Sequence, residues 1–215
     1  MTTFNIDFER SILLTSTAQK AASSHGSKWS NLNLAGALHY ITGNFINRTP
    51  VFTNEVCCRV FLEELKKLNK EWPSKLIAHV LMPDHFHLIS NPRDGRIKEF
   101  MRDLKSRSAK AIVRINSHFR FPETDEGHQV WQESFKGMAL RSAWMIWQKI
   151  NYVHANPVKS RLVKSAKVYY WSSYRSFYSL SDEPLPVDHD WWWPEDSEKL
   201  SAAMKQLMVS PKKGK

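Results

Sequence analysis

Two histidines in the segment HVLMPDHFHLIS, residues 79–90, stand one position apart on either side of an aromatic residue. In a β-strand, residues i and i+2 point to the same face of the sheet. His85 and His87 would therefore lie side by side, while Phe86 faces the other way. Neutral imidazole is a common ligand of divalent metals. The pair predicts half of a metal site, which needs a third ligand from another element to be complete.

A second candidate for chemistry is the segment NYVHANPVKSRLV, in which Tyr152 and Asn156 are four residues apart near the end of an expected helix and share one face. Asn156 offers a carbonyl oxygen to a hard cation, and Tyr152 offers a phenolate nucleophile. Each residue also has a structural explanation, because aromatic residues at helical spacing usually pack in a core and asparagine is common at helix ends.

Taken with the histidines, these residues predict attack of a tyrosine on a phosphodiester. A free tyrosine has a pKa of about 10, so a nearby cation is needed to favour its phenolate. A covalent 5′-phosphotyrosine would retain the energy of the broken bond. A free 3′-OH could then reverse the reaction and rejoin DNA, which is strand transfer rather than hydrolysis.

Composition favours a polyanionic partner. The 215-residue chain has 31 Lys and Arg against 21 Asp and Glu, a net charge of +10; a solubilising surface is the alternative explanation. The two cysteines, Cys57 and Cys58, are adjacent, which is poor geometry for a disulfide and fits a reducing cytoplasm. Because no signal peptide and no run of about 20 apolar residues is evident, we expect a cytoplasmic protein without a membrane span.

Periodicity predicts an ordered set of elements. Strands are expected within 36–45, at 74–82, at 85–90 and within 129–140, and helices at 54–68, at 96–116 and from a Ser142 cap to the residue before Pro157. This order indicates an α+β fold with a ferredoxin-like split βαβ core: an antiparallel sheet with helices on one face, the other face free for ligands, and an added C-terminal helix that carries the tyrosine. We expect an N-terminal extension at 1–34, one domain at 35–180, and a C-terminal extension with a disordered basic tail at 181–215.

The segments LMPDHFHLI, YVHANPVKSRLV and WSSYRSF, in this order, resemble the HUH-class single-tyrosine transposases, specifically the REP-associated tyrosine transposases. GALHYITGNFINRTPVF is similar to that family's first strand and turn, and the resemblance covers roughly residues 35–178. It implies that His85 and His87 bind Mg²⁺ or Mn²⁺, that Asn156 completes the metal site, and that Tyr152 forms the covalent link to DNA. It also implies a single-stranded or hairpin DNA substrate derived from repeats, and a monomer or homodimer.

Three segments depart from the family pattern. Asp84 stands where the family usually has asparagine, WQESFKGMAL is a loose version of the usual Gln-Gly-Arg-Phe-Lys segment, and TGNFINR replaces the usual Arg-Gly-Asn turn while keeping Arg48. In addition, two imidazoles suit Mn²⁺ or Zn²⁺ better than Mg²⁺ by ligand softness.

Basic and aromatic residues near these motifs are candidates for DNA contacts. We expect Arg48, Lys136, Arg161 and Arg175 to contact phosphates, and Trp171 and Tyr174 to stack on bases, although aromatic residues in such a run are more often part of a core. His79 and His154 are expected to be packing or surface residues.

Two other functions stay open from the residues. One is a non-catalytic, domesticated protein that binds nucleic acid sequence-specifically on an open sheet, which would not need Tyr152 near the histidines. The other is a metal phosphodiesterase that uses activated water, which would need more carboxylate ligands than Asp84 supplies.

Overall fold

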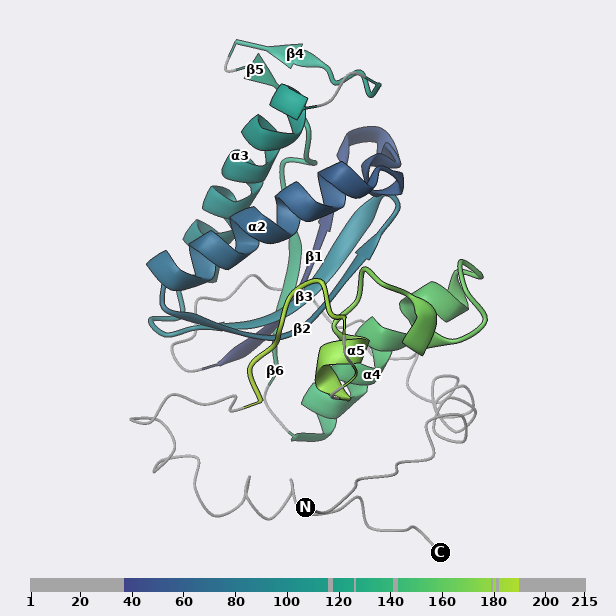
Figure 1. Cartoon of the computed structure of the whole chain (residues 1–215). Coiled ribbons are helices and arrows are strands. Elements are labelled where there is room, and N and C mark those ends of the chain that lie inside the picture. The colour runs from purple at the N-terminus through teal and green to yellow at the C-terminus, as the bar shows by residue number, and fades with distance from the viewer. Residues whose placement is uncertain are drawn as a thin grey trace, which may run out of the picture.

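The computed structural model describes residues 37–115, 118–125, 127–140, 143–178, 180 and 182–189. The expected extension at 1–34 and the chain from residue 190 onward, including the basic tail, lie outside these residues. The long elements follow the predicted order (Figure 1): β1 (Leu38–Asn44), α2 (Glu55–Glu71), β2 (Ser74–Met82), β3 (His85–Pro92), α3 (Ile97–Ile115), β6 (Lys136–Leu140) and α4 (Ala143–Lys159). The short elements are η1 (Ile46–Arg48), η2 (Val51–Thr53), β4 (Glu123–Thr124), β5 (Gly127–His128), η3 (Ala166–Val168) and α5 (Tyr174–Phe177).

The main sheet has the strand order β2-β3-β1-β6, and every neighbouring pair in it is antiparallel. Helix α2 connects β1 to β2, and α3 lies between β3 and β6, so each helix follows one strand of the sheet's central pair. The predicted ferredoxin-like α+β core is confirmed.

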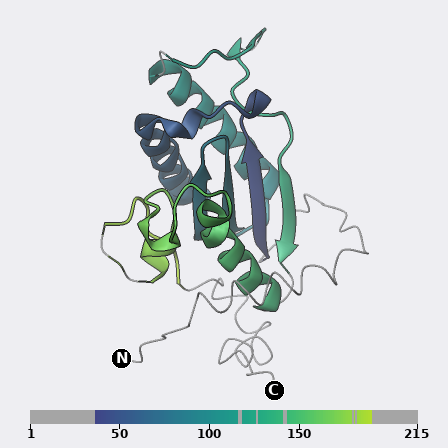
Figure 2. The same cartoon turned by 90° about the vertical axis from the view of Figure 1, so that its right-hand side faces the viewer.

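Helices cover both faces of this sheet. Helices α2 and α3 bury Phe61 and Phe100 against residues such as Phe86 on one face. On the opposite face, α4 buries Ile150 and Val153 in a second core. Figure 2 shows the sheet between these helices. The expectation that this second face is free for ligands was therefore wrong in part, because the apolar stripe of α4 is buried against it.

The close packing of Phe86 against Gly43 determines which face of the sheet each side chain of β3 points to. The two residues are paired across β1 and β3. A Cβ atom on Gly43 would lie 2.4 Å from Cζ of Phe86, which is too close for any side chain. Glycine at this position therefore lets the Phe86 ring lie across the neighbouring strand. With Phe86 buried on the α2 side, His85 and His87 point to the other face.

Two features differ from those expected: the end of helix α4 and an additional short hairpin. Helix α4 continues to Lys159 with Pro157 inside it, because a proline in the last turns removes only one backbone hydrogen bond of the helix. The fourth strand, β6, occupies the last five residues of the segment 129–140 in which it was expected. The loop before it contains the short hairpin β4–β5, whose four residues are exposed and carry no hydrophobic signal.

Strand β2 lies at the edge of the sheet, and the chain that follows α4 covers this edge. Ser172 forms a β-bridge with Val80, and the backbone N–H of Leu76 donates to the Asp188 carboxylate over 2.7 Å. Leu185, between these contacts, is buried in the core of α2 and α3. A covered edge blocks pairing with other chains. Within the described ranges, no helix has the length and apolar character that crossing a membrane requires.

Candidate active site

The two histidines of the HFH motif lie next to each other at the start of β3. Their ring centroids are 4.8 Å apart and the rings are nearly perpendicular. His87 is 4% exposed, whereas the side chain of His85 is 15% exposed and reaches the surface. The prediction that the strand presents both imidazoles on one face agrees with this geometry.

Each imidazole is held through its Nδ1 atom. Nδ1 of His85 is 2.6 Å from Oδ1 of Asp84, and since a carboxylate only accepts, the imidazole N–H donates. Nδ1 of His87 is 2.9 Å from the Tyr40 hydroxyl and 2.8 Å from the Thr42 hydroxyl. Neither Nε2 atom makes a hydrogen bond within the described chain. This donor set fits a divalent metal, because hydrogen bonds at Nδ1 leave the Nε2 lone pairs for coordination.

Burial keeps the histidines neutral, which ligation requires. It lowers the pKa of His87 to about 3, and the positive charges of Lys149 and Arg48 act in the same direction. Burial also lowers the pKa of His85, although the hydrogen bond from His85 to Asp84 opposes that shift.

Arg48 lies beside the histidine pair, and its contact with DNA stays a prediction. Its Nε is 2.7 Å from Oδ2 of Asp84, so the Asp84 carboxylate bridges the Arg48 guanidinium and the His85 imidazole. Arg48 and the preceding Asn47 both have left-handed backbone conformations, with φ of 55° and 51°. This tight turn after β1 directs the guanidinium back toward Asp84.

Tyr152 lies on helix α4, and its ring points toward the histidine pair of β3. Its ring centroid is 5.5 Å from that of His87 and 6.0 Å from that of Tyr40. Tyr40 stacks on His87 with centroids 5.4 Å apart. Burial raises the pKa of Tyr40, so its hydroxyl stays protonated at neutral pH. The structure thus brings together His85, His87 and Tyr152.

Asn156 lies one turn after Tyr152 and is 7% exposed. Its Nδ2 donates to the backbone carbonyl of Tyr152 over 2.8 Å, whereas its Oδ1 makes no hydrogen bond to the rest of the described chain. No hydrogen bond joins Asn156 to either histidine there, so its role as a ligand stays a prediction. Among the described residues, no group of three or more His, Cys, Asp or Glu side chains is placed to hold a metal ion. Any further ligand from the described residues would therefore be of another kind, such as an amide oxygen.

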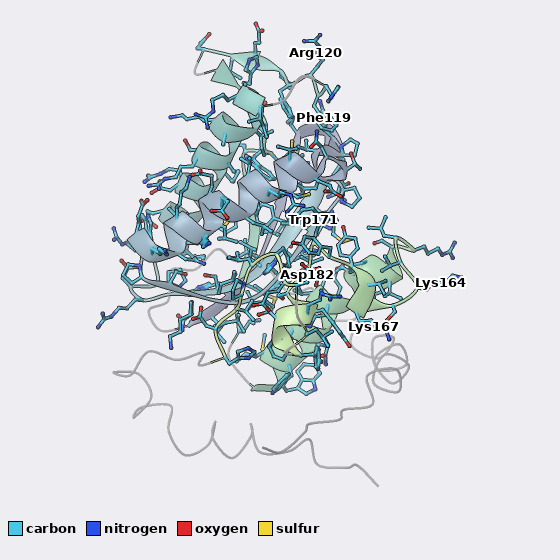
Figure 3. All side chains as sticks on the ribbon, viewed as in Figure 1. Phe119, Arg120, Lys164, Lys167, Trp171 and Asp182 are labelled. Atoms are coloured by element: carbon cyan, nitrogen blue, oxygen red, sulfur yellow. The ribbon has the colours of Figure 1, made fainter. Side chains whose placement is uncertain are left out.

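The other residues predicted to contact DNA lie either in β6, near the histidine pair, or in the segment that follows α4. Lys136 is exposed and pairs across the sheet with Thr42, the partner of His87, so it lies near the site. Trp171 packs against the core under Arg59, whose guanidinium is 5.4 Å from the Trp171 ring. Figure 3 shows Trp171 between α2 and the C-terminal segment.

Three further predicted contacts follow α4. The Tyr174 ring contacts that of His154, and Arg175 donates a hydrogen bond to the carbonyl of Lys167. Arg161 is exposed. Their contacts with DNA stay predictions.

Four residues of the site were missed from the sequence. Tyr40 and Thr42 alternate along β1 and hold His87, and their i, i+2 spacing was the available signal. Lys149 and Lys159 place their ammonium nitrogens 5.4 Å and 5.2 Å from the centroid of the Tyr152 ring. Their positions three residues before and seven after Tyr152 put them on its face of the helix.

Comparison with known proteins identifies the family. The family described as "Transposase IS200 like" matches residues 38–156, which run from the first residue of β1 to Asn156. The fold is similar to that of a REP-associated tyrosine transposase bound to a REP hairpin, with a TM-score of 0.60 and 21% identity over 76% of this chain and 92% of that chain. A protein from Deinococcus radiodurans R1, named as a candidate transposase, gives a TM-score of 0.42 and 19% identity over 60% of this chain and 95% of that chain. No curated protein matches the chain. Since the matched residues are more than half of the chain and contain the histidine pair and Tyr152, the protein belongs to the family of IS200-like transposases.

Proposed function

We propose that this transposase cuts and rejoins single-stranded or hairpin DNA through a covalent bond to Tyr152, with a divalent metal held by His85 and His87. The observation that carries the proposal is the position of Tyr152 against His87, with ring centroids 5.5 Å apart. A protein that only bound nucleic acid would not need a tyrosine beside two imidazoles whose Nε2 atoms make no hydrogen bond within the described chain. The REP hairpin bound by the structure of similar fold supports a hairpin substrate.

The reaction follows from the residues at the site. The Oη of Tyr152 attacks the phosphorus and forms an O–P bond, while the bond from phosphorus to the 3′-oxygen breaks. The 3′-oxygen leaves with a proton, and the phenol loses one, so the exchange balances without a co-reactant. A bound Mg²⁺ or Mn²⁺ would polarise the phosphoryl oxygen and neutralise its developing charge. Because the phosphotyrosine bond is a diester like the one broken, a second 3′-OH can reverse the step.

The histidines and their partners position the metal ligands. Asp84 holds His85, and Tyr40 and Thr42 hold His87, through Nδ1, so neither Nε2 atom is used in a hydrogen bond within the described chain. Asn156 would supply a neutral oxygen, and Mn²⁺ is the better match to the two nitrogen ligands. A water-activating phosphodiesterase is less well supported, because the described residues contain no carboxylate-rich cluster.

The experiment is incubation of the protein with a 3′-labelled, hairpin-bearing single-stranded DNA and Mn²⁺ or Mg²⁺, followed by a denaturing gel. We expect a protein–DNA adduct with the wild type and none with Tyr152→Phe. Tyr178→Phe serves as a matched control, since Tyr178 packs against Tyr174 and outside the site. An adduct with Tyr152→Phe would show that another residue is the nucleophile.

A further inference from the structure

Two lysines flank Tyr152 along one face of α4. Lys149 lies about one helical turn before the tyrosine and Lys159 about two turns after it. Their ammonium nitrogens are 5.4 Å and 5.2 Å from the Tyr152 ring centroid. The ammonium of Lys149 is also 4.8 Å from the ring centroid of Tyr40, which stacks on His87. Lys149 is therefore the lysine on the side of the metal ligands.

Electrostatics make this lysine pair (Lys149 and Lys159) a site for an anion. Burial lowers the pKa of Lys149, and the charge of Lys159 lowers it further, so the two ammonium groups repel each other. A phosphate between or beside them would relieve that repulsion. Lys149 is half-buried, and a charge partly removed from water attracts an anion more strongly than a surface charge does. Lysine binds phosphate as a compact point charge, without a fixed orientation.

We propose that the lysine pair holds two successive phosphates of one DNA strand, with Lys149 on the scissile phosphate and Lys159 on its neighbour. The assignment of the scissile phosphate rests on the proposed function, because it takes Tyr152 as the nucleophile. Lys149 is then a catalytic residue that neutralises charge on the phosphate under attack, whereas Lys159 sets the path of the strand past Tyr152.

A binding experiment tests the pair without cleavage. The affinity for a fluorescein-labelled single-stranded oligonucleotide is measured in EDTA between 50 and 200 mM NaCl for the wild type, Lys149→Met and Lys159→Met. Each lost phosphate contact should reduce the slope of log K against log[salt] by about 0.7 for single-stranded DNA. The arginine variants of both lysines keep the charge and should retain the wild-type slope.

Lys164→Met is the matched control, because Lys164 is an exposed lysine of the loop after α4 and lies at the outer edge of the molecule in Figure 3. It removes the same charge from the same part of the chain and should leave the slope unchanged. Unaltered slopes in Lys149→Met and Lys159→Met, or an equal loss in Lys164→Met, would overturn the inference.

Cleavage then separates the two roles. At saturating DNA, Lys149→Met should slow adduct formation by about 100-fold, the scale seen when one donor to a transition-state oxyanion is removed. Lys159→Met should mainly weaken binding, and Lys149→Arg should recover part of the rate. If the wild type forms no adduct but the slopes change, the pair binds phosphate and the proposed function fails. If the adduct forms and neither lysine affects slope or rate, the function stands and this inference fails.

Discussion

The rings of His87 and Tyr152 lie 5.5 Å apart, although one belongs to the sheet and the other to a helix that packs on it. Tyr40 contacts both rings, with centroids 5.4 Å from His87 and 6.0 Å from Tyr152. The proposed metal ligand and the proposed nucleophile therefore share a partner. A displacement of α4 along the sheet would change the distance between them directly.

Asp84 should strengthen the metal site compared with an asparagine at the same position. Its carboxylate accepts a hydrogen bond from Nδ1 of His85, which makes the imidazole a stronger donor to a cation. Asp84→Asn keeps an acceptor but removes the charge, so we expect Mn²⁺ affinity to fall about 10-fold. Isothermal titration calorimetry or Mn²⁺ EPR measures this directly. Asp94→Asn, which removes a carboxylate paired with Arg96 outside the site, should leave the affinity unchanged.

Tyr40 should position His87 through its hydroxyl. Tyr40→Phe keeps the stacked ring but removes one of the two acceptors at Nδ1 of His87. We expect the free energy of unfolding to fall by about 0.5–1.5 kcal/mol and the Mn²⁺ affinity to fall several-fold. In the matched control Tyr169→Phe, the lost hydroxyl donates to the carbonyl of Leu81. That variant should lose similar stability but keep its metal affinity, and the same loss of affinity in both variants would contradict the role of Tyr40.

Gly43 should be intolerant of any side chain. Gly43→Ala would place Cβ 2.4 Å from the Phe86 ring, so the ring or the strand must move. Overpacking of this kind costs about 1–3 kcal/mol of stability, measured by urea denaturation. Phe86→Leu replaces the ring with a smaller side chain. The double variant Gly43→Ala with Phe86→Leu should therefore lose less stability than the sum of the losses of the two single variants. Additive effects would mean that the clash does not cause the loss.

Buried histidines should make the metal-free protein sensitive to acid. Burial lowers the pKa of His79 and His154 to about 3, whereas an unfolded histidine titrates near 6.5. Between these values the unfolded chain binds more protons, so the stability is complete above about pH 6.5 and falls as the pH drops toward 3. Each histidine contributes a slope of up to about 1.4 kcal/mol per pH unit.

The variant His154→Gln tests this. Glutamine can still hydrogen-bond Ser173, the partner of Nε2 in His154, but takes up no proton. Urea denaturation in EDTA at several pH values should give a shallower dependence of stability on pH than in the wild type. An unchanged slope would show that His154 is protonated alike in both states.

The local patterns of the chain were enough to predict much of the site. Strand alternation placed His85 and His87 on one face, and helical spacing aligned Tyr152 with Asn156, because both periodicities are properties of the backbone itself. The order of strands and helices in turn predicted the ferredoxin-like core. Helix ends and short strands were predicted less well, since Pro157 is accommodated in the last turns and the β4–β5 hairpin has no hydrophobic pattern.

Only the tertiary structure decided how these parts meet. Helix α4 packs on the face to which His87 points, which puts Tyr152 beside the imidazole and covers a face expected to be open. Tyr40 and Thr42 hold His87 from the neighbouring strand, a contact that depends on β1 lying next to β3. Contacts between elements are determined by the strand order of the sheet and by the packing of the helices on it. The periodicity of one element does not predict which side chains of another element it will contact.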